Sequence, residues 1–282
     1  MSSAPPGRSN WLRACSSILF IFLCLGMAAA TYFLAPARTN MLILGIDRTP
    51  DNTNISRSDT NILVTVLPLE PYIGMLSIPR DLWLEIPGVG ENRINTAHFF
   101  AEADQPGSGP AATIQTIRHN FGVDVDYFVR IRFDGITGVV DAMGSVELSL
   151  DKPTGGYPAG SHHLNGEQAL AFVRDRSGTD DFFRMANGQL FLKQVLQQLL
   201  SPASWPRLPA VISALREAVD TNIPFWQLPR LALAILRAGP DGIDSRVINR
   251  EMVAPFTTSG GAQVLAPVWD QINPVVAEMF GR

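Results

Sequence analysis

Aspartates and arginines gather in four short stretches of this 282-residue chain, LILGIDR, SRSDTN, SIPRD and VRDRSGTDDFFR. The carboxylates of Asp47 and Asp59 are hard oxygen ligands that suit Mg²⁺, with Mn²⁺ as the alternative ion. Guanidinium groups form bidentate hydrogen bonds with phosphate oxygens. The arginines of these stretches that suit this purpose are Arg57, Arg80, Arg174, Arg176 and Arg184, with Arg48 and, in the segment ENRIN, Arg93 as weaker candidates. The pattern predicts a site for a diphosphate and a metal ion.

The acidic residues of this site are expected at neighbouring strand ends. Asp47 follows an apolar run after a glycine, and Asp59 opens the next apolar run. Ligands of open α/β sheets bind at strand ends. Asp81 follows a third run, where it is expected to join the metal ligands or to orient Arg80. One such aspartate would be an ordinary turn residue, but a set at three strand ends favours a shared site.

Each arginine also admits a structural interpretation, because surface salt bridges are common. Arg174 and Arg176 are one residue apart, and in an extended segment such side chains project to the same side. The pair is therefore expected to hold one diphosphate. Arg184 is expected near the start of a long helix, where the helix dipole favours acids over cations, so its position indicates an anionic partner.

Other chemistries lack their sequence signatures. The four histidines show no metal-binding spacing, and no G-x-S-x-G or Walker A motif occurs. Both cysteines, Cys15 and Cys24, lie in an apolar run near the N-terminus, so the rest of the chain has no thiol for a disulfide or a nucleophile. A net charge of −4 argues against a nucleic-acid-binding domain.

The apolar run near the N-terminus extends from Ala14 to Ala37 without a charged residue, which is enough to cross a bilayer core of about 30 Å. A cleaved signal peptide is the alternative, but the run exceeds the usual apolar region of about 7 to 15 residues. Arg8 and Arg13 precede the run and weakly favour a cytoplasmic N-terminus. We expect a cytoplasmic tail at 1–14, a single-pass cell-membrane anchor at 15–37 and an extracytoplasmic remainder.

Short apolar runs and helical periodicity alternate after the anchor. Strands are expected at 40–46, 61–68, 72–78, 82–87, 126–133 and 145–150, and helices at 111–121, 134–143, 166–173 and 182–200. This alternation predicts an α/β fold with a central mixed β-sheet sandwiched between helices, α-β-α. Prolines after residue 201 begin further helices at 210–219 and 225–237. Residues 201–282 are therefore expected to form a helical C-terminal extension packed on a domain at 38–200.

The order of these motifs resembles the LytR-CpsA-Psr family, whose members are membrane-anchored enzymes of the bacterial cell envelope. The resemblance is carried by LILGIDR, RSDTNILVTV, GMLSIPRDLWLEIPG, ENRINTAH, VDYFVRIRFDGITGVVDAMGSVEL, LNGEQALAFVRDR and DDFFRM, between about residues 40 and 200. One departure is RMANGQ at 184–189, where family members commonly have RMARQQ.

The resemblance implies phosphotransfer of a glycopolymer from a polyprenyl-diphosphate carrier to a cell-wall acceptor such as peptidoglycan. It implies Asp47 and Asp59 as magnesium ligands, the five arginines as diphosphate-binding residues, and an apolar pocket for the lipid. Asp81 is then the candidate general base. Two alternatives remain open, a polyprenyl-diphosphate hydrolase and a non-enzymatic envelope regulator of the transcriptional-attenuator type. Nucleic acid is not an expected partner.

Overall fold

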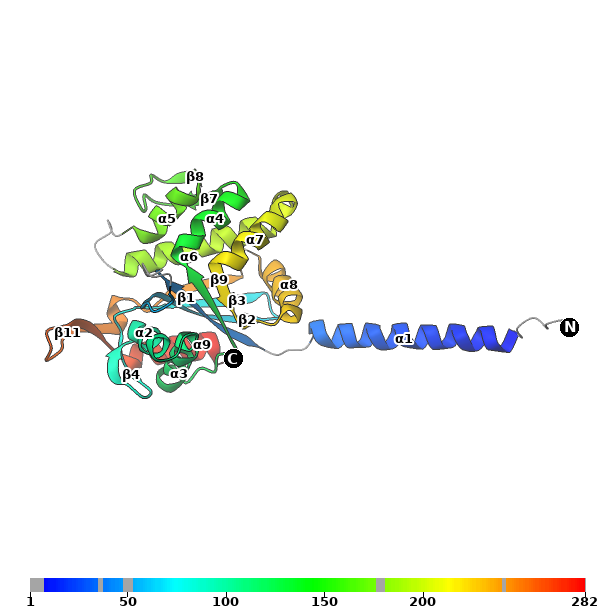
Figure 1. Cartoon of the computed structure of the whole chain (residues 1–282), viewed down its shortest axis with the longest axis horizontal. Coiled ribbons are helices and arrows are strands. Elements are labelled where there is room, and N and C mark those ends of the chain that lie inside the picture. The colour runs from blue at the N-terminus through cyan, green and yellow to red at the C-terminus, as the bar shows by residue number, and fades with distance from the viewer. Residues whose placement is uncertain (1–7, 35–37, 48–52, 176–180, 240–241, 282) are drawn as a thin grey trace.

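The computed structural model describes residues 8–34, 38–47, 53–175, 181–239 and 242–281. A six-stranded mixed sheet forms the centre of the domain, with the strand order β10-β3-β2-β1-β6-β9 (Figure 1). Its strands are β1 (Thr39–Ile46), β2 (Ser58–Leu67), β3 (Tyr72–Ile78), β6 (Tyr127–Arg132), β9 (Val219–Thr221) and β10 (Ile243–Val247). β1 pairs in parallel with β6 and β3 with β10, whereas the other neighbours are antiparallel.

The inner strands are apolar on both faces, as expected for a sheet that helices cover on both sides. Side chains alternate along β1, so that Leu42 and Leu44 pack into one core cluster and Met41 into another on the opposite face. The predicted α-β-α arrangement is confirmed.

One face of the sheet is covered by α2 (Asn95–Asp104), α3 (Gly109–Phe121) and α9 (Trp269–Phe280) (Figure 1). Ile117 of α3 and Ile272 of α9 are fully buried against Leu63 and Leu76 of the sheet. Two hairpins lie on this side, β4 (Trp83–Ile86) with β5 (Gly90–Arg93), and β11 (Val253–Thr257) with β12 (Gln263–Pro267).

The other face is covered by α6 (Asp181–Leu200) and α8 (Leu228–Ala238). Beyond α6, a separate apolar cluster joins α4 (Phe133–Met143), α5 (Gly166–Arg174) and α7 (Leu208–Ala218) to the hairpin of β7 (Val146–Leu150) and β8 (Gly160–Leu164). Phe172, on α5, is the largest fully buried side chain of this cluster. The helices expected from residue 111 to residue 200 are therefore present.

Residues 201–282 contain the two expected helices, α7 and α8, as well as strands that the sequence analysis did not predict. They supply both edge strands of the central sheet, β9 and β10, and the β11–β12 hairpin. The remaining elements of this segment are α9 and three short 3₁₀ helices, η1 (Pro202–Arg207), η2 (Phe225–Gln227) and η3 (Arg250–Met252). β9 has only three residues and β10 reads IDSRV, so neither carries a clear alternating pattern.

The N-terminal helix α1 (Arg8–Leu34) points away from the domain (Figure 1). Its segment Cys15–Phe33 is long and apolar enough to cross a membrane, and none of it is buried inside the protein. The exposed side chains include Leu19, Phe22 and Leu23, each more than half accessible. This exposure distinguishes α1 from the core helix of a soluble domain.

Candidate active site

Strand pairing brings the predicted acidic and basic residues to one edge of the sheet. Ile46 lies opposite Ser58 in the antiparallel β1–β2 pair, so Asp47 and Asp59 follow directly at adjacent strand ends. Asn61 of β2 lies opposite Ile78, the last residue of β3, which places the following turn with Arg80 and Asp81 beside Asp59. The expected convergence of three strand ends is confirmed.

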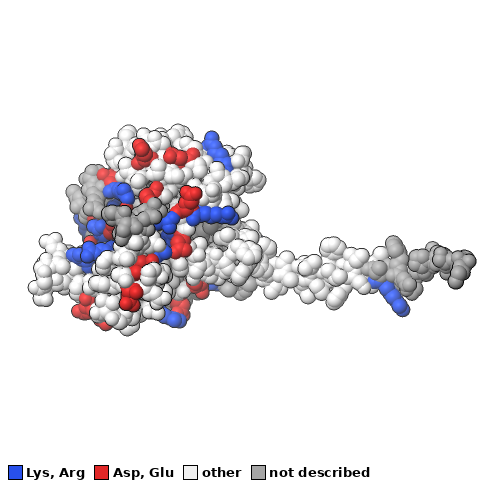
Figure 2. Space-filling view, in the orientation of Figure 1, with Lys and Arg blue, Asp and Glu red and all other residues white. Residues whose placement is uncertain are grey.

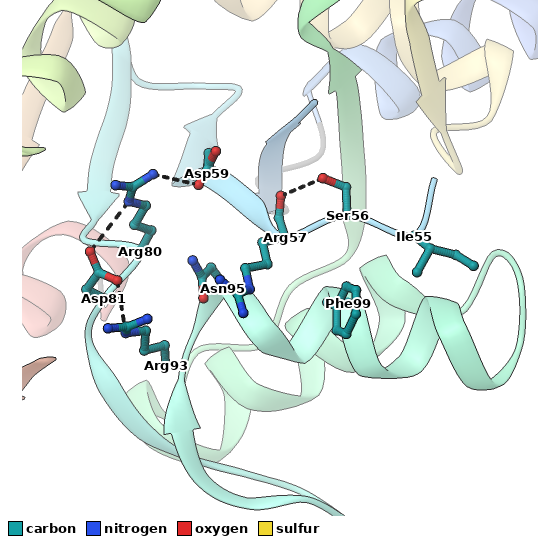
Figure 3. A pocket seen from close by; sticks show the side chains of 9 residues that line it. All are labelled: Ile55, Ser56, Arg57, Asp59, Arg80, Asp81, Arg93, Asn95 and Phe99. Atoms are coloured by element: carbon teal, nitrogen blue, oxygen red, sulfur yellow. Dashed lines mark hydrogen bonds and ion pairs between the residues drawn. The ribbon is translucent and has the colours of Figure 1, made fainter. Parts of the chain in front are cut away.

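Two adjoining cavities open at this edge. The first, of about 480 Å³, is lined by Ile55, Ser56, Arg57, Asp59, Arg80, Asp81, Arg93, Asn95 and Phe99 (Figure 3). The second, of about 500 Å³, is lined by Asp47, Asp59, Thr60, Phe133, Val173, Arg174 and Arg184. Asp59 lines both cavities, so its carboxylate marks the boundary between them.

Arg80 is the centre of the charge network. Its guanidinium lies 2.9 Å from Asp59, 3.5 Å from Asp81 and 3.4 Å from Asp181. Burial alone would lower the pKa of Arg80, but Asp181, Asp59 and Asp81 together raise it above its ordinary value. Arg80 is therefore a fixed positive charge between three carboxylates.

Arg174 forms an ion pair with Asp47 across the second cavity. Both side chains are 47% exposed, so solvent and ligand can reach the pair. The expectation of an extended segment at Arg174 was wrong, because it is the last residue of α5. That helix starts from a capping box between Asn165 and Gln168, and its amphipathic pattern carries it through Arg174. Arg176 lies outside the described residues.

Arg184 lies one turn into α6 and reaches back to the sheet edge. Its Nη2 donates to the carbonyl oxygen of Asp59 at 3.1 Å, and it forms a 2.6 Å ion pair with Asp181. The predicted position near a helix start is confirmed. Asp181 neutralises the unfavourable interaction of this cation with the helix dipole, which accounts for part of its presence there.

Asp181 was missed by the sequence analysis, because an acid in the first turn of a helix is an ordinary stabilising residue. Its burial raises the pKa of its carboxyl above the usual range, against the opposing charges of Arg184 and Arg80. Its Oδ2 is buried and has no hydrogen-bond partner among the described residues. Only the contacts of the folded chain identify this carboxyl as part of the site.

Asp81 bridges two arginines, since Oδ2 lies 3.5 Å from Arg80 and Oδ1 lies 3.1 Å from Nε of Arg93 (Figure 3). This arrangement agrees with the expected role of orienting an arginine. Arg93 also donates to the carbonyl of Gln263 at 2.8 Å, which connects β5 to β12. Arg57 is exposed and lines the first cavity, where no carboxylate of the described residues pairs with it.

A buried polar cluster supports the loop that carries Arg57. Nδ1 of His98 lies 2.8 Å from the carbonyl of Ser56, while Nη1 of Arg130 lies 3.4 Å from Nε2 and 3.2 Å from Glu102. Because a carbonyl only accepts, Nδ1 carries the proton. Burial, together with the charge of Arg130, lowers the pKa of His98, so the ring stays neutral. His98 is thus structural, as its spacing indicated.

The donor set fits a metal ion that is shared with a substrate. No group of three or more His, Cys, Asp or Glu side chains is arranged around a common point within the described parts of the chain. Asp47 and Asp59 nevertheless line one cavity together with Arg174 and Arg184. Mg²⁺ in phosphoryl-transfer sites commonly takes one or two carboxylates and completes its shell with phosphate oxygens and water. Two carboxylates beside the guanidinium groups of Arg174 and Arg184 meet that requirement.

Similar proteins share this fold and sequence pattern. The chain is 28% identical over 255 residues to a protein of Oceanobacillus iheyensis named polyisoprenyl-teichoic acid–peptidoglycan teichoic acid transferase TagU, and it spans 75% of that protein. It is 35% identical over 200 residues to the protein of the same name from Halalkalibacterium halodurans. The match covers 67% of this chain and 63% of that relative, so the chain spans about two thirds of its length.

Solved structures agree in fold. The structure titled "TagT bound to LIIa-WTA" matches with a TM-score of 0.68 at 23% identity, over 87% of this chain and 91% of that one. Bacillus subtilis TagV matches with a TM-score of 0.69 at 22% identity, over 87% and 98%. A model of the LytR_cpsA_psr family matches residues 34–278, well beyond the region from about 40 to 200 in which the sequence motifs were recognised. The chain therefore belongs to the LytR-CpsA-Psr family.

Proposed function

We propose that this protein is a magnesium-dependent phosphotransferase that moves a glycopolymer from a polyprenyl-diphosphate carrier to a cell-wall acceptor such as peptidoglycan. The observation that carries the proposal is the position of Asp59, which belongs to two adjoining cavities and contacts both Arg80 and Arg184. The names of the relatives, teichoic acid transferases, support the same substrate class.

Asp47 and Asp59 would hold the magnesium ion, which when bound would neutralise negative charge on the diphosphate. Arg174 and Arg80, which pair with these two carboxylates in the free protein, are placed to turn toward phosphate oxygens when substrate enters. Arg184 adds a cationic group to the second cavity, and Arg57 reaches the first cavity from its exposed loop. Catalysis of this kind depends on positioning and electrostatic stabilisation.

In the proposed reaction the hydroxyl of the acceptor attacks the sugar-linked phosphorus. A new phosphorus–oxygen bond forms, the bond to the bridging oxygen breaks, and polyprenyl phosphate leaves with the bonding electrons. The hydroxyl proton needs a base. Asp81 remains the candidate from sequence, although both of its oxygens face arginines. Asp181 is the second candidate, because its Oδ2 has no described partner and its pKa is raised.

The substrate class requires a membrane location for the protein. α1 would anchor the chain as a single span with a short cytoplasmic N-terminus, because two arginines and no acid precede its apolar segment Cys15–Phe33. The domain would then lie on the extracytoplasmic side, next to a carrier that is itself a membrane lipid. This topology supplies both the carrier and the cell-wall acceptor to the same cavity edge.

A regulatory function is the second candidate, because the chain is also 28% identical over 195 residues to a Staphylococcus aureus protein named regulatory protein MsrR. A passive regulator would need to bind the diphosphate carrier but not to cleave it. The charged residues of the two cavities suit binding in either case. The presence of two carboxylates for a metal ion favours catalysis over binding alone.

The test uses the full chain in proteoliposomes with a polyprenyl-diphosphate-linked saccharide, with and without Mg²⁺ and peptidoglycan. We expect metal-dependent release of polyprenyl phosphate and transfer of saccharide to peptidoglycan, both lost in Asp59→Ala. Release without transfer would identify a hydrolase. Binding without turnover under every condition would reject the enzyme and favour the regulator.

A further inference from the structure

Helix α8 is apolar on the face that packs against the sheet and on the face that is exposed. Leu231 and Ala234 are buried in the core against β2 and β3. Leu228, Ala232 and Leu236, spaced four residues apart, are exposed on the opposite side. A row of large apolar side chains exposed along one helix commonly marks a contact surface. The exposed face of α8 therefore calls for a partner.

The preceding 3₁₀ helix η2 extends this exposed apolar surface. Phe225 is 78% exposed and Trp226 is 56% exposed, values that are unusual for large aromatic side chains in a monomeric soluble domain. Together with the exposed stripe of α8 they form one continuous stretch of chain. We call this surface, defined by Phe225, Trp226, Leu228, Ala232 and Leu236, the η2–α8 face.

The η2–α8 face adjoins the end of the apolar N-terminal helix. The hydroxyl of Tyr32, near the C-terminal end of α1, donates a hydrogen bond to the carbonyl oxygen of Trp226. α8 lies beside this end of α1 (Figure 1), and the described surface of the domain next to it is largely uncharged in the corresponding view, apart from a basic side chain that reaches the edge of the domain above it (Figure 2). The exposed aromatic residues thus lie at the level where α1 meets the domain.

The charged residues near the η2–α8 face also suit a position at a membrane surface. No aspartate or glutamate occurs between Asp220 and Asp241, whereas two arginines do, Arg230 and Arg237. Arg230 is buried and Arg237 is exposed at the end of α8. A surface that joins apolar and aromatic side chains to a positive charge suits the headgroup region of a bilayer, where tryptophan and arginine are favoured.

We propose that the η2–α8 face docks on the outer leaflet of the membrane that α1 spans, so that the domain is held at a fixed orientation to the bilayer. The inference rests on the membrane location given above, but not on the reaction. Phe225, Trp226 and the exposed leucines enter the interface between headgroups and acyl chains, and Arg237 lies among lipid phosphates. The partner is the lipid surface itself, because the face continues directly from the helix end that enters it.

The experiment measures the depth of the η2–α8 face in the full-length protein. In a Cys15→Ser, Cys24→Ser background, a bimane label is placed at Ala232→Cys, in phosphatidylglycerol–phosphatidylethanolamine proteoliposomes that contain spin-labelled lipid. The matched control is Val89→Cys, which is 48% exposed in the β4–β5 turn. Docking predicts several-fold stronger quenching at position 232 than at position 89. Equal quenching at the two positions would overturn the proposal.

A second measurement separates lipid from a second copy of the chain. Spin labels at Ala232→Cys report the distance between neighbouring molecules, and docking on lipid predicts no short distance when the protein is diluted in excess lipid. A short distance that persists on dilution would show that another copy covers the face and would overturn the proposal. Replacing Phe225 and Trp226 together by serine should reduce quenching at 232 to the level at 89, with an unchanged unfolding temperature. Neither readout needs turnover, so a failure of the proposed reaction would leave this test valid.

Discussion

Nη1 of Arg80, which lines the first cavity, lies 2.9 Å from Oδ1 of Asp59, which lines both cavities. Among the described residues, Asp59 alone lines both cavities, while Arg80 extends from it toward Asp81 and Asp181. A ligand that bridges the cavities would therefore pass Asp59, with Arg80 on the side of the first cavity.

Replacing Arg80 by alanine should lower turnover by about 10²- to 10³-fold, as is typical when one preorganised charge at a reaction centre is lost. Arg80→Lys should recover part of the binding but not the bidentate geometry, so it should stay well below the native rate. The measurement is saccharide transfer in proteoliposomes. Arg118→Ala is the control, because Arg118 pairs with Asp124 on the surface where both side chains are at least 70% exposed. A similar loss in both variants would contradict a specific role.

Asp47→Asn and Asp59→Asn should each raise the Mg²⁺ concentration required for half-maximal activity, because an amide is a weaker ligand than a carboxylate. High Mg²⁺ should partly restore the activity of these two variants, whereas the activity of Arg174→Ala should not increase with the ion concentration. Titration of activity against Mg²⁺ gives the comparison. An unchanged metal requirement in both aspartate variants would reject the proposed ligands.

Acidification should destabilise the fold through the buried cluster beneath Ser56. Because the pKa of His98 is lowered in the folded protein, the neutral ring contributes to the free energy of unfolding above its ordinary pKa of 6.5. This contribution is lost as the pH falls from 6.5 through the lowered pKa of the folded state. Hydrogen bonds from the N–H groups of Gly107 and Gly109, with the charge of Arg130, outweigh burial and lower the pKa of Glu102, so its contribution is lost below about 4.5. The titrations of His98 and Glu102 therefore both lower the free energy of unfolding as the pH falls.

Thermal unfolding in detergent between pH 8 and pH 5 measures this dependence. His98→Asn keeps a donor for the Ser56 carbonyl but does not titrate, so its unfolding temperature should change less over this range. His119→Asn is the control for a histidine that is exposed. If native protein and His98→Asn showed the same pH dependence, the buried histidine would not be its source.

Two glycines of α4 offer a matched test of helix packing. A Cβ at Gly135 would lie 2.4 Å from Cβ of Ala218 on α7, whereas a Cβ at Gly138 would meet nothing within 4 Å. Gly135→Ala should therefore destabilise the protein by about 1–3 kcal/mol through overpacking. Gly138→Ala should stabilise it by about 0.5–1 kcal/mol, because alanine favours the helix. Chemical denaturation compares both variants, and equal effects would contradict the close approach of α4 and α7.

A variant of Asp181 tests whether this carboxyl is the general base that accepts the proton of the acceptor hydroxyl. If Asp181 accepts the proton, activity rises as its carboxyl ionises, and its raised pKa places this rise above its ordinary value of 3.8. Asp181→Asn should abolish that limb of the pH–rate profile and lower turnover, with Asp81→Asn as the comparison. If one variant loses the rise of the rate with pH, the replaced carboxyl is the general base. If both variants keep this rise, neither Asp81 nor Asp181 is the base.

The sheet edge could be predicted from sequence because Asp47, Asp59, Arg80 and Asp81 all flank long apolar runs whose strand character is unambiguous. The register of β1, β2 and β3 then leaves little freedom in their mutual placement. The role of Asp181 could not be predicted, because it depends on contacts with arginines of distant elements, whereas the helical state of Arg174 follows from the local signals of α5 and was missed by one residue. The strands after residue 200 were missed for a different reason, since short edge strands gain their structure from the neighbour with which they pair.

Both edge strands of the central sheet come from segments that are synthesised late. β3 ends at residue 78, yet its outer neighbour β10 begins only at residue 243, and β6 likewise depends on β9 at residue 219. Until then the newly made chain carries two open strand edges, which are prone to pair with other chains. The order of synthesis therefore makes the last third of the sequence a built-in protection against aggregation, and a chain truncated at residue 200 would lack it.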